Sequence, residues 1–114
     1  MDGMKRFVSL FFIALLCAAT VALGSCSYIS WSHGRAFAAT TEGEQVSVVL
    51  QRFGKPTHIE KPGELYSVYA DRPCTGPCIE RLWWEPPFFR GIDAYSVEVD
   101  QDQRVRNLVH WSSP

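Results

Sequence analysis

The hydrophobic pattern changes character along the chain, from a long apolar run at the start, through a helical period, to an alternating period near the end. The apolar run extends from Phe7 to Leu23 and is preceded by Lys5 and Arg6. A basic start, an apolar middle and small residues at the end are the parts of a secretory signal. The pattern therefore predicts a chain that is exported from the cytoplasm.

Leu23-Gly24-Ser25-Cys26 closes this run and resembles the lipobox of bacterial lipoproteins. In such proteins the cysteine is diacylated and the peptide before it is removed. We therefore expect residues 1–25 to be a lipoprotein signal peptide and Cys26 to be the lipidation site. The run is also close to the lower limit of about 17 residues for spanning a bilayer. An uncleaved inner-membrane anchor and plain secretion thus remain alternatives.

An amphipathic helix is predicted from Glu42 to Phe53, after a linker over residues 26–40. Thr41 and Glu44 have the spacing of a capping box, in which a hydroxyl and a carboxylate satisfy the first backbone amides of a helix. Gly54 can end the helix, and Pro56 prevents its continuation. The apolar positions recur at i, i+3, i+4 and i+7, which is one face of a helix: Val46, Val49, Leu50 and Phe53.

Strands are predicted in the remaining sequence, where aromatic and β-branched residues follow a period of two. Pro86-Pro87 ends the second of them, since proline cannot donate to a ladder. The last two enclose a polar turn and form an antiparallel hairpin. The expected strands are Glu64–Ala70, Glu80–Glu85, Asp93–Asp100 and Arg104–Trp111.

The expected faces of the hairpin follow from the same alternation. Tyr95, Val97 and Val99 share one face of the third predicted strand, and Val105, Val109 and Trp111 share one face of the fourth. One helix over three or four antiparallel strands makes an α+β domain, which we expect to span residues 41–114.

These pieces resemble the small outer-membrane lipoproteins of the BamE (SmpA/OmlA) family. The likeness covers roughly residues 40–111 and rests on "VLQRFGKPT" (49–57) and "YSVEVDQDQRVRNLVHW" (95–111) after a lipobox. The positions that match the family's helix and turn phrases are Thr41, Val46, Phe53, Gly54, Pro56, Val99, Asp100, Gln103 and Val105.

The resemblance implies a helix-on-sheet fold, an outer-membrane address and a non-catalytic supporting role in barrel assembly or envelope integrity. Ser27 fits this address, because an aspartate after the lipidated cysteine is the usual signal for retention in the inner membrane. Two departures are the missing Gly-Met before Thr41 and the region 72–91, whose cysteine pair and Pro-Pro-Phe-Phe are not part of the family's pattern.

Length and charge restrict the number of domains and the kinds of partner that the chain can have. A chain of 114 residues has room for one domain, and its formal net charge of −1 provides no basic stripe for nucleic acid. A domain this small is often marginally stable and benefits from a covalent staple or a partner.

The four cysteines suggest such a staple. Cys17 lies within the apolar run and leaves with a cleaved signal, which leaves Cys74 and Cys78 as a pair in an oxidising compartment, where thiols form disulfides. A redox pair usually has two intervening residues rather than three. A zinc site needs a second pair of ligands, which the sequence does not offer. We expect a structural disulfide, with neither a metal nor a cofactor.

The aromatic cluster after Arg81 is the candidate contact surface. Successive strand residues face opposite sides of a sheet, so both tryptophans cannot enter one core. Exposed aromatics beside arginine are typical of interface hot spots. A small domain also needs aromatic side chains in its core, and the sequence favours neither interpretation over the other. The candidate partner-binding residues are Trp83, Trp84, Phe88, Phe89 and Arg90.

The sequence offers no catalytic constellation. His33, His58 and His110 are widely separated, and no serine or cysteine nucleophile is tied to them by spacing. The expected function is a lipid-anchored binding or scaffolding module on the periplasmic face of the bacterial outer membrane, with an envelope protein as partner. The alternatives are an enzyme or redox protein that uses the Cys74/Cys78 pair and a protein anchored in the inner membrane.

Overall fold

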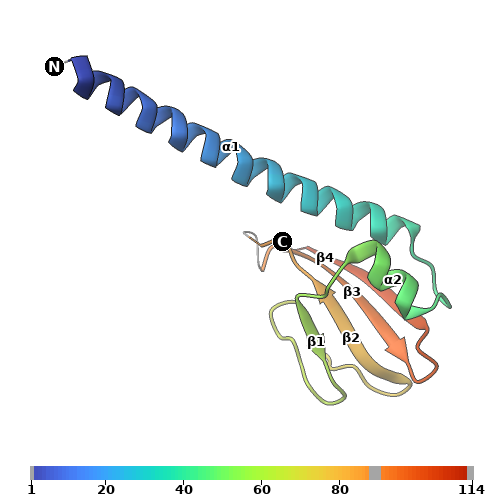
Figure 1. The fold of residues 1–114 in the computed structure, drawn as a ribbon. Helices are drawn as coiled ribbons and strands as arrows, with labels where there is room; N and C mark the ends of the chain where they lie inside the picture. Colours follow the sequence, from blue (N-terminus) through green and yellow to red (C-terminus); the bar gives the residue numbers. More distant parts are fainter. Residues whose placement is uncertain (1, 88–90, 113–114) are drawn as a thin grey trace.

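The computed structural model describes residues 2–87 and 91–112, and within them every side chain except those of Cys26, Ser27 and Ser30. In this part of the chain a long helix leads into a small helix-and-sheet domain (Figure 1). The sheet is antiparallel throughout, with the strand order β1-β2-β3-β4. The predicted α+β class is confirmed. The elements are α1 (Asp2–Ala39), α2 (Val46–Phe53), β1 (His58–Glu60), β2 (Cys78–Trp84), β3 (Asp93–Asp100) and β4 (Val105–Ser112).

The β3–β4 hairpin forms as predicted, and a bulge changes the faces of its last strand. Glu98 pairs with Asn107, but the next residue, Val99, pairs with Val105, so β4 carries one extra residue at this point. A bulge shifts the alternation by one position. Val105 therefore shares the helix-covered face with Val99, and the prediction that it lies with Val109 and Trp111 was wrong.

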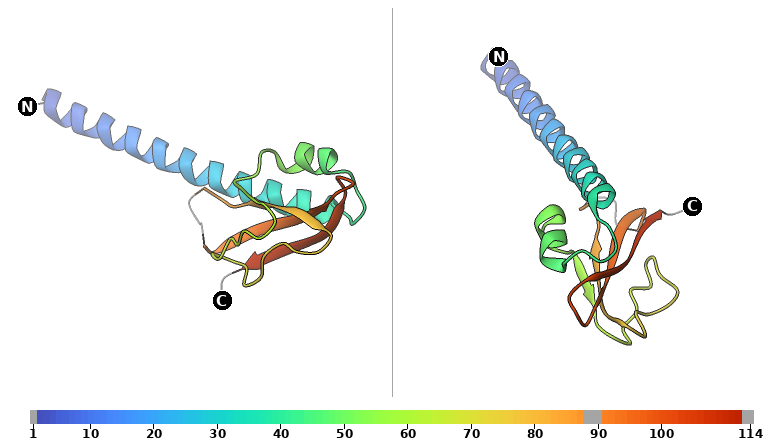
Figure 2. Two further views of the ribbon diagram at one scale, coloured as in Figure 1. Left: turned by 90° about the horizontal axis from the view of Figure 1, so that it is seen from below. Right: turned by 90° about the vertical axis from the view of Figure 1, so that its right-hand side faces the viewer.

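The predicted strand Glu64–Ala70 is absent, and the neighbour of β2 is instead the short strand β1. Residues 61–73 form a loop whose backbone groups bond locally: the amides of Tyr69 and Ala70 both donate to the carbonyl of Tyr66. The loop lies on the side of the sheet away from α2 (Figure 2). Its alternating tyrosines cover the sheet rather than extend it.

Helix α2 starts later than the predicted Glu42, and ends at Phe53 as predicted. The Thr41 amide does donate to the Glu44 carboxylate, at 2.7 Å, but this bond closes a turn before the helix. The Gly43 amide and the Glu44 carbonyl are bonded to the backbone of Val105, which excludes them from a helix. At the other end, Gly54 has a φ of +85°, and its amide donates to Leu50.

The predicted linker is helical, and its last turns belong to the domain. Alanine is the strongest helix former, and this segment continues α1 without a break. His33, Ala36, Phe37 and Thr40 recur at i, i+3, i+4 and i+7, and this stripe packs on the domain. Gly34 lies so close to the sheet that an added Cβ would be 3.4 Å from the Tyr95 hydroxyl.

The main core lies between this helical layer and the sheet. Its centre is the stacked pair of Phe53 and Trp84, with ring centroids 4.3 Å apart, and the Trp84 indole donates to the carbonyl of Gly54 at 3.1 Å. These contacts attach α2 to β2. The buried members of this core are Ala36, Val49, Phe53, Leu82, Trp84, Tyr95, Val97, Val99 and Val105.

Candidate functional site

Trp83 and Trp84 face opposite sides of the sheet as expected, and both are fully buried. Trp84 lies in the core under the helices, whereas Trp83 lies in a second cluster under the loop 61–73. Of the two interpretations that the sequence left open, the structure therefore favours core packing over partner binding for these two tryptophans. The side chain of each completes a core because the domain covers both faces of its sheet. The other three candidates, Phe88, Phe89 and Arg90, lie outside the described residues.

The expected disulfide between Cys74 and Cys78 is present in the structure. Its Cα atoms are 5.6 Å apart, and both cysteines are buried. Cys78 is the first residue of β2, so the disulfide joins the end of the covering loop to the sheet. The staple thus fixes the position at which the loop 61–73 rejoins the sheet.

A buried ion pair lies under the same loop. The Arg81 guanidinium donates to both carboxylate oxygens of Glu60, at 2.7 and 2.9 Å, and the Trp83 indole and the Tyr66 backbone amide donate to the same carboxylate. Glu60 is completely buried, and Arg81 also donates to the carbonyl of Arg72. This bidentate geometry is the strong form of the ion pair. It ties the sheet to Tyr66 in the middle of the loop and to Arg72 near its end.

The electrostatics keep the Glu60 carboxyl ionised. Burial raises its pKa, but the hydrogen bonds from Arg81, the Tyr66 amide and Trp83 together lower it by more than burial raises it. The pKa of Glu60 therefore lies below its ordinary value. A folded-state pKa below the unfolded one means that the ionised form stabilises the fold. The ion pair therefore has a structural function.

A second buried carboxylate holds the loop where β2 ends. The hydroxyls of Tyr66 and Tyr69 each donate to an oxygen of Glu85, which is 3% exposed. The Tyr69 hydroxyl also accepts from the Gly91 amide at 2.7 Å. Burial, together with the Glu85 charge, raises the pKa of Tyr69 to about 12. The phenol therefore remains a donor at neutral pH and joins the loop to the start of β3.

Two exposed apolar side chains are sequence neighbours of residues in this tyrosine–carboxylate network: Val68 precedes Tyr69, and Ile92 follows Gly91. Val68 and Ile92 are 52% and 55% exposed, and the position of a Cβ on Gly91 would be 3.9 Å from Val68. We call Val68 and Ile92 the loop-end surface. Because Tyr66, Tyr69 and Glu85 fix the backbone on both sides, this surface presents apolar groups from a rigid frame. It takes the place of the two tryptophans as the candidate contact surface.

A histidine-containing junction joins α1 to the sheet. His33 packs edge-on against Tyr95, whose ring stacks on His110 with centroids 4.4 Å apart, and His110 is paired with Asp93. Burial lowers the pKa of His33, and its buried Nδ1 has no hydrogen-bond partner among the described residues. Within the described part of the chain, no three metal-ligating side chains come together here or elsewhere.

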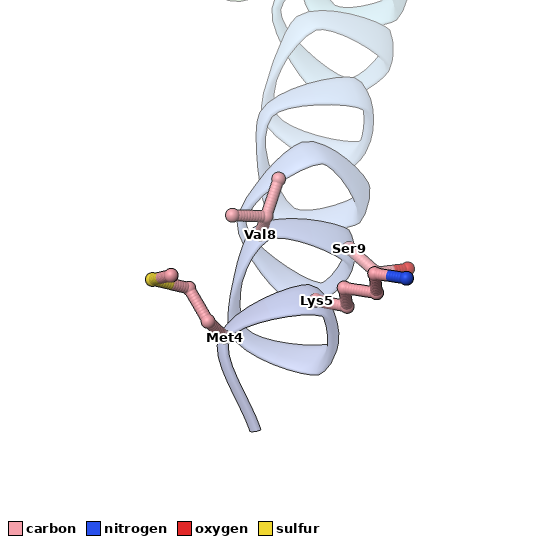
Figure 3. A pocket seen from close by; sticks show the side chains of 4 residues that line it. All are labelled: Met4, Lys5, Val8 and Ser9. Carbon is pink, nitrogen blue, oxygen red and sulfur yellow. The ribbon is translucent and has the colours of Figure 1, made fainter. Parts of the chain in front are cut away.

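The first part of α1, Asp2–Ser25, is long and apolar enough to cross a membrane, and none of it is buried. Near its start a shallow hollow is lined by Met4, Lys5, Val8 and Ser9, which all project from this one helix (Figure 3). Because a single helix lines this hollow, it is a depression between side chains of that helix and not a pocket enclosed by several elements. The N-terminal apolar helix fits a signal peptide or a membrane anchor.

The sequence analysis missed the buried carboxylates and the tyrosines that hold them. A glutamate at a strand end and an arginine in the next strand are ordinary surface residues by sequence, and their partnership depends on the β1–β2 register that pairs Glu60 with Arg81. The helical spacing of His33, Ala36 and Phe37 was the available signal for the packing of α1.

The fold and the site together define a small α+β domain with a disulfide and two buried carboxylate clusters, joined rigidly to an apolar N-terminal helix. Comparison with known proteins finds no match for this chain among family models, curated proteins or solved structures.

Proposed function

We propose that this protein is a lipid-anchored, non-catalytic binding module on the periplasmic face of a bacterial outer membrane. The observation that carries the proposal is the exposed apolar segment Asp2–Ser25, which directly precedes the cysteine of the lipobox. Export, removal of residues 1–25 and acylation of Cys26 are parts of the same proposal, and they rest on the lipobox. The disulfide fits an oxidising compartment.

Binding is favoured over chemistry by what the buried polar groups contact. The carboxylates of Glu60 and Glu85 accept hydrogen bonds from Arg81, Tyr66 and Tyr69, and these bonds hold the loop against the sheet. The result is a stiff support beside the loop-end surface. Preorganised apolar groups lose little conformational entropy on binding, so a partner can bind them with a small contact area. We propose an envelope protein as that partner, in barrel assembly or envelope integrity as the BamE-like features suggest.

The alternative of a thiol enzyme uses Cys74 and Cys78. Both are buried in a disulfide, and a catalytic cysteine pair requires an exposed, acidic thiol. The alternative of an inner-membrane anchor is favoured by a specific observation: α1 continues without a break from Asp2 to Ala39, as a helix that spans and emerges from a bilayer does. Processing at Cys26 separates this alternative from the lipoprotein.

We expect Cys26→Ala to abolish processing when the full chain is expressed in a Gram-negative host. Without the thiol no diacylglycerol is attached, and the peptide before residue 26 stays on the protein. Intact-mass spectrometry of the membrane fraction checks this, since the wild type should lose residues 1–25 and gain lipid mass. Cys17→Ala, at an exposed cysteine of the same helix, is the matched control and should be processed normally. If the wild type and Cys26→Ala both keep residues 1–25 and gain no lipid mass, the result would instead establish the uncleaved anchor.

We expect a photo-crosslinker at Val68 or Ile92 to capture one discrete envelope protein in intact cells, because these side chains are exposed beside a fixed frame. Leu50, on α2 at the other face of the sheet, provides a control of similar chemistry and should capture nothing discrete. Mass spectrometry of the adduct identifies the partner. An empty result at both loop-end positions, or the same adduct from Leu50, would argue against this surface.

A further inference from the structure

The helix beyond the apolar segment carries an exposed aromatic pair and a cation on one side. Tyr28 and Trp31 are 66% and 57% exposed, with ring centroids 6.2 Å apart. The guanidinium of Arg35, also exposed, lies over the Trp31 ring at 4.9 Å from its centroid. We call Tyr28, Trp31 and Arg35 the juxtamembrane face. The domain does not cover these three side chains, whereas His33 and Ala36 on the same turns of the helix are buried against it.

We infer that the juxtamembrane face is a bilayer contact, in which Tyr28 and Trp31 lie among phospholipid headgroups and Arg35 binds the phosphate of an anionic phospholipid. The inference rests on the proposed anchoring of the chain through its N-terminal segment. It holds for either form of anchor, because the apolar segment ends at Ser25 and the proposed lipid is carried by Cys26.

The positions along the helix match the layers of a membrane. With a rise of about 1.5 Å per residue, Tyr28 lies about 5 Å and Trp31 about 9 Å beyond Ser25. The headgroup layer on each side of the hydrocarbon core is about 5–7 Å thick. Helical side chains lean toward the N-terminus, which brings the Trp31 indole back into that layer. Tryptophan and tyrosine are the residues enriched at this depth.

The charge complements the same surface. Arg35 is about 15 Å beyond Ser25 at its Cα, but its side chain extends back over Trp31, toward the membrane. Trp31, Arg35 and Arg52 contribute to a groove of about 350 Å³ beside α1. Glu44 is paired with Arg52 at 2.7 Å, whereas in the described part of the chain no carboxylate lies within ion-pair distance of Arg35. Arg35 is therefore the cation available to a lipid phosphate.

The first test measures the depth of Trp31 in the full chain, reconstituted into phosphatidylcholine vesicles. The vesicles contain lipids brominated near the headgroups or near the bilayer centre. The Trp31 signal is the difference between wild type and Trp31→Phe, which removes the background from Trp83, Trp84 and Trp111. We expect the shallow bromines to quench this signal and the deep ones to leave it nearly unchanged. Strong quenching by deep bromines, or by neither set in vesicle-bound protein, would overturn the inference.

The second test concerns the phosphate contact. Addition of phosphatidylglycerol should strengthen shallow quenching, with the docked-to-undocked ratio rising about fivefold for one cation at an anionic surface. Arg35→Gln should abolish this increase, and Lys55→Gln, an exposed cation after α2, should retain it. Equal behaviour of the two variants would overturn the role of Arg35. Failure of the full chain to float with any vesicles would instead overturn the proposed anchor, which distinguishes the two failures.

Discussion

Replacing Glu60 with glutamine should lower the free energy of unfolding by about 3–5 kcal/mol, because the buried guanidinium of Arg81 loses its bidentate carboxylate and keeps only Glu98, 3.8 Å away, as a counter-charge. Arg81 is 7% exposed at its side chain, and Glu60 is not exposed at all, so water cannot take the place of the missing charge. A small domain has a total stability of about 5–15 kcal/mol, so the variant should lose a large part of it. Urea unfolding of the full chain in detergent micelles, followed by tryptophan fluorescence, measures the loss.

The matched control is a surface pair next to the buried one, between Lys61 after β1 and Glu80 in β2. Lys61 and Glu80 form an ion pair at 3.1 Å, but the Lys61 side chain is 62% exposed. Such pairs contribute about 0–1 kcal/mol, so Lys61→Gln should change the unfolding midpoint very little. Equal effects of Glu60→Gln and Lys61→Gln would show that the Glu60 carboxylate does not carry the buried charge inferred from its contacts.

The pH dependence provides a second readout of Glu60. Its folded-state pKa is lowered, so its contribution is complete above the ordinary pKa of a glutamate and is lost as the pH falls through the folded-state value. Hydrogen bonds from Arg52 and from the Thr41 amide lower the pKa of Glu44 to about 2, so its contribution disappears in the same direction. The wild type should thus lose stability below about pH 4.5. In Glu60→Gln this acid-dependent loss should be smaller.

Replacing Trp84 with alanine should cost about 3–5 kcal/mol, the range for deleting a buried aromatic side chain. The indole stacks on Phe53 and donates to Gly54, so the substitution removes the contact that holds α2 on β2. Loss of this contact should also loosen α1, which packs beside α2. Hydrogen exchange on the full chain should show that Trp84→Ala, compared with the wild type, speeds the exchange of the α2 amides more than that of the β3 amides.

Two further variants test this explanation. Trp84→Phe retains an aromatic ring against Phe53 but removes the donor to Gly54, so we expect a loss of about 1–2 kcal/mol, smaller than for alanine. Trp31→Ala, at an exposed tryptophan, should stay within about 0.5 kcal/mol of the wild type in micelles. If Trp84→Ala were as mild as Trp31→Ala, Trp84 would not be a core residue.

The regular elements could be predicted where the local pattern and the tertiary contacts agree. The β3 alternation is complete, and its bounds were predicted as Asp93–Asp100. The segment Glu64–Ala70 has the same composition as a strand, but its tyrosine hydroxyls and the Tyr66 amide bond to carboxylates, and β1 occupies the place beside β2. Periodicity alone cannot reveal which backbone groups have another partner.

The site was harder to predict than the fold because its key residues meet across the chain. Trp83 and Trp84 were correctly placed on opposite faces, but whether the second face is covered depends on the loop 61–73, which has no regular structure. Glu60 and Arg81 become partners only through the register of two strands. The disulfide, in contrast, follows from two nearby cysteines and the expected compartment.

The unbroken helix α1 limits where this protein can act. About eleven residues separate the end of the apolar segment from Phe37, which packs on the core, so this contact lies within about 18 Å of the proposed anchor point. A flexible tether of the same length would let the domain sample many orientations and distances, whereas a packed helix allows nearly one. An anchored chain of this design therefore has a very short reach. It would select partners that share its membrane and diffuse beside it in two dimensions, and soluble proteins would encounter the loop-end surface in one fixed orientation.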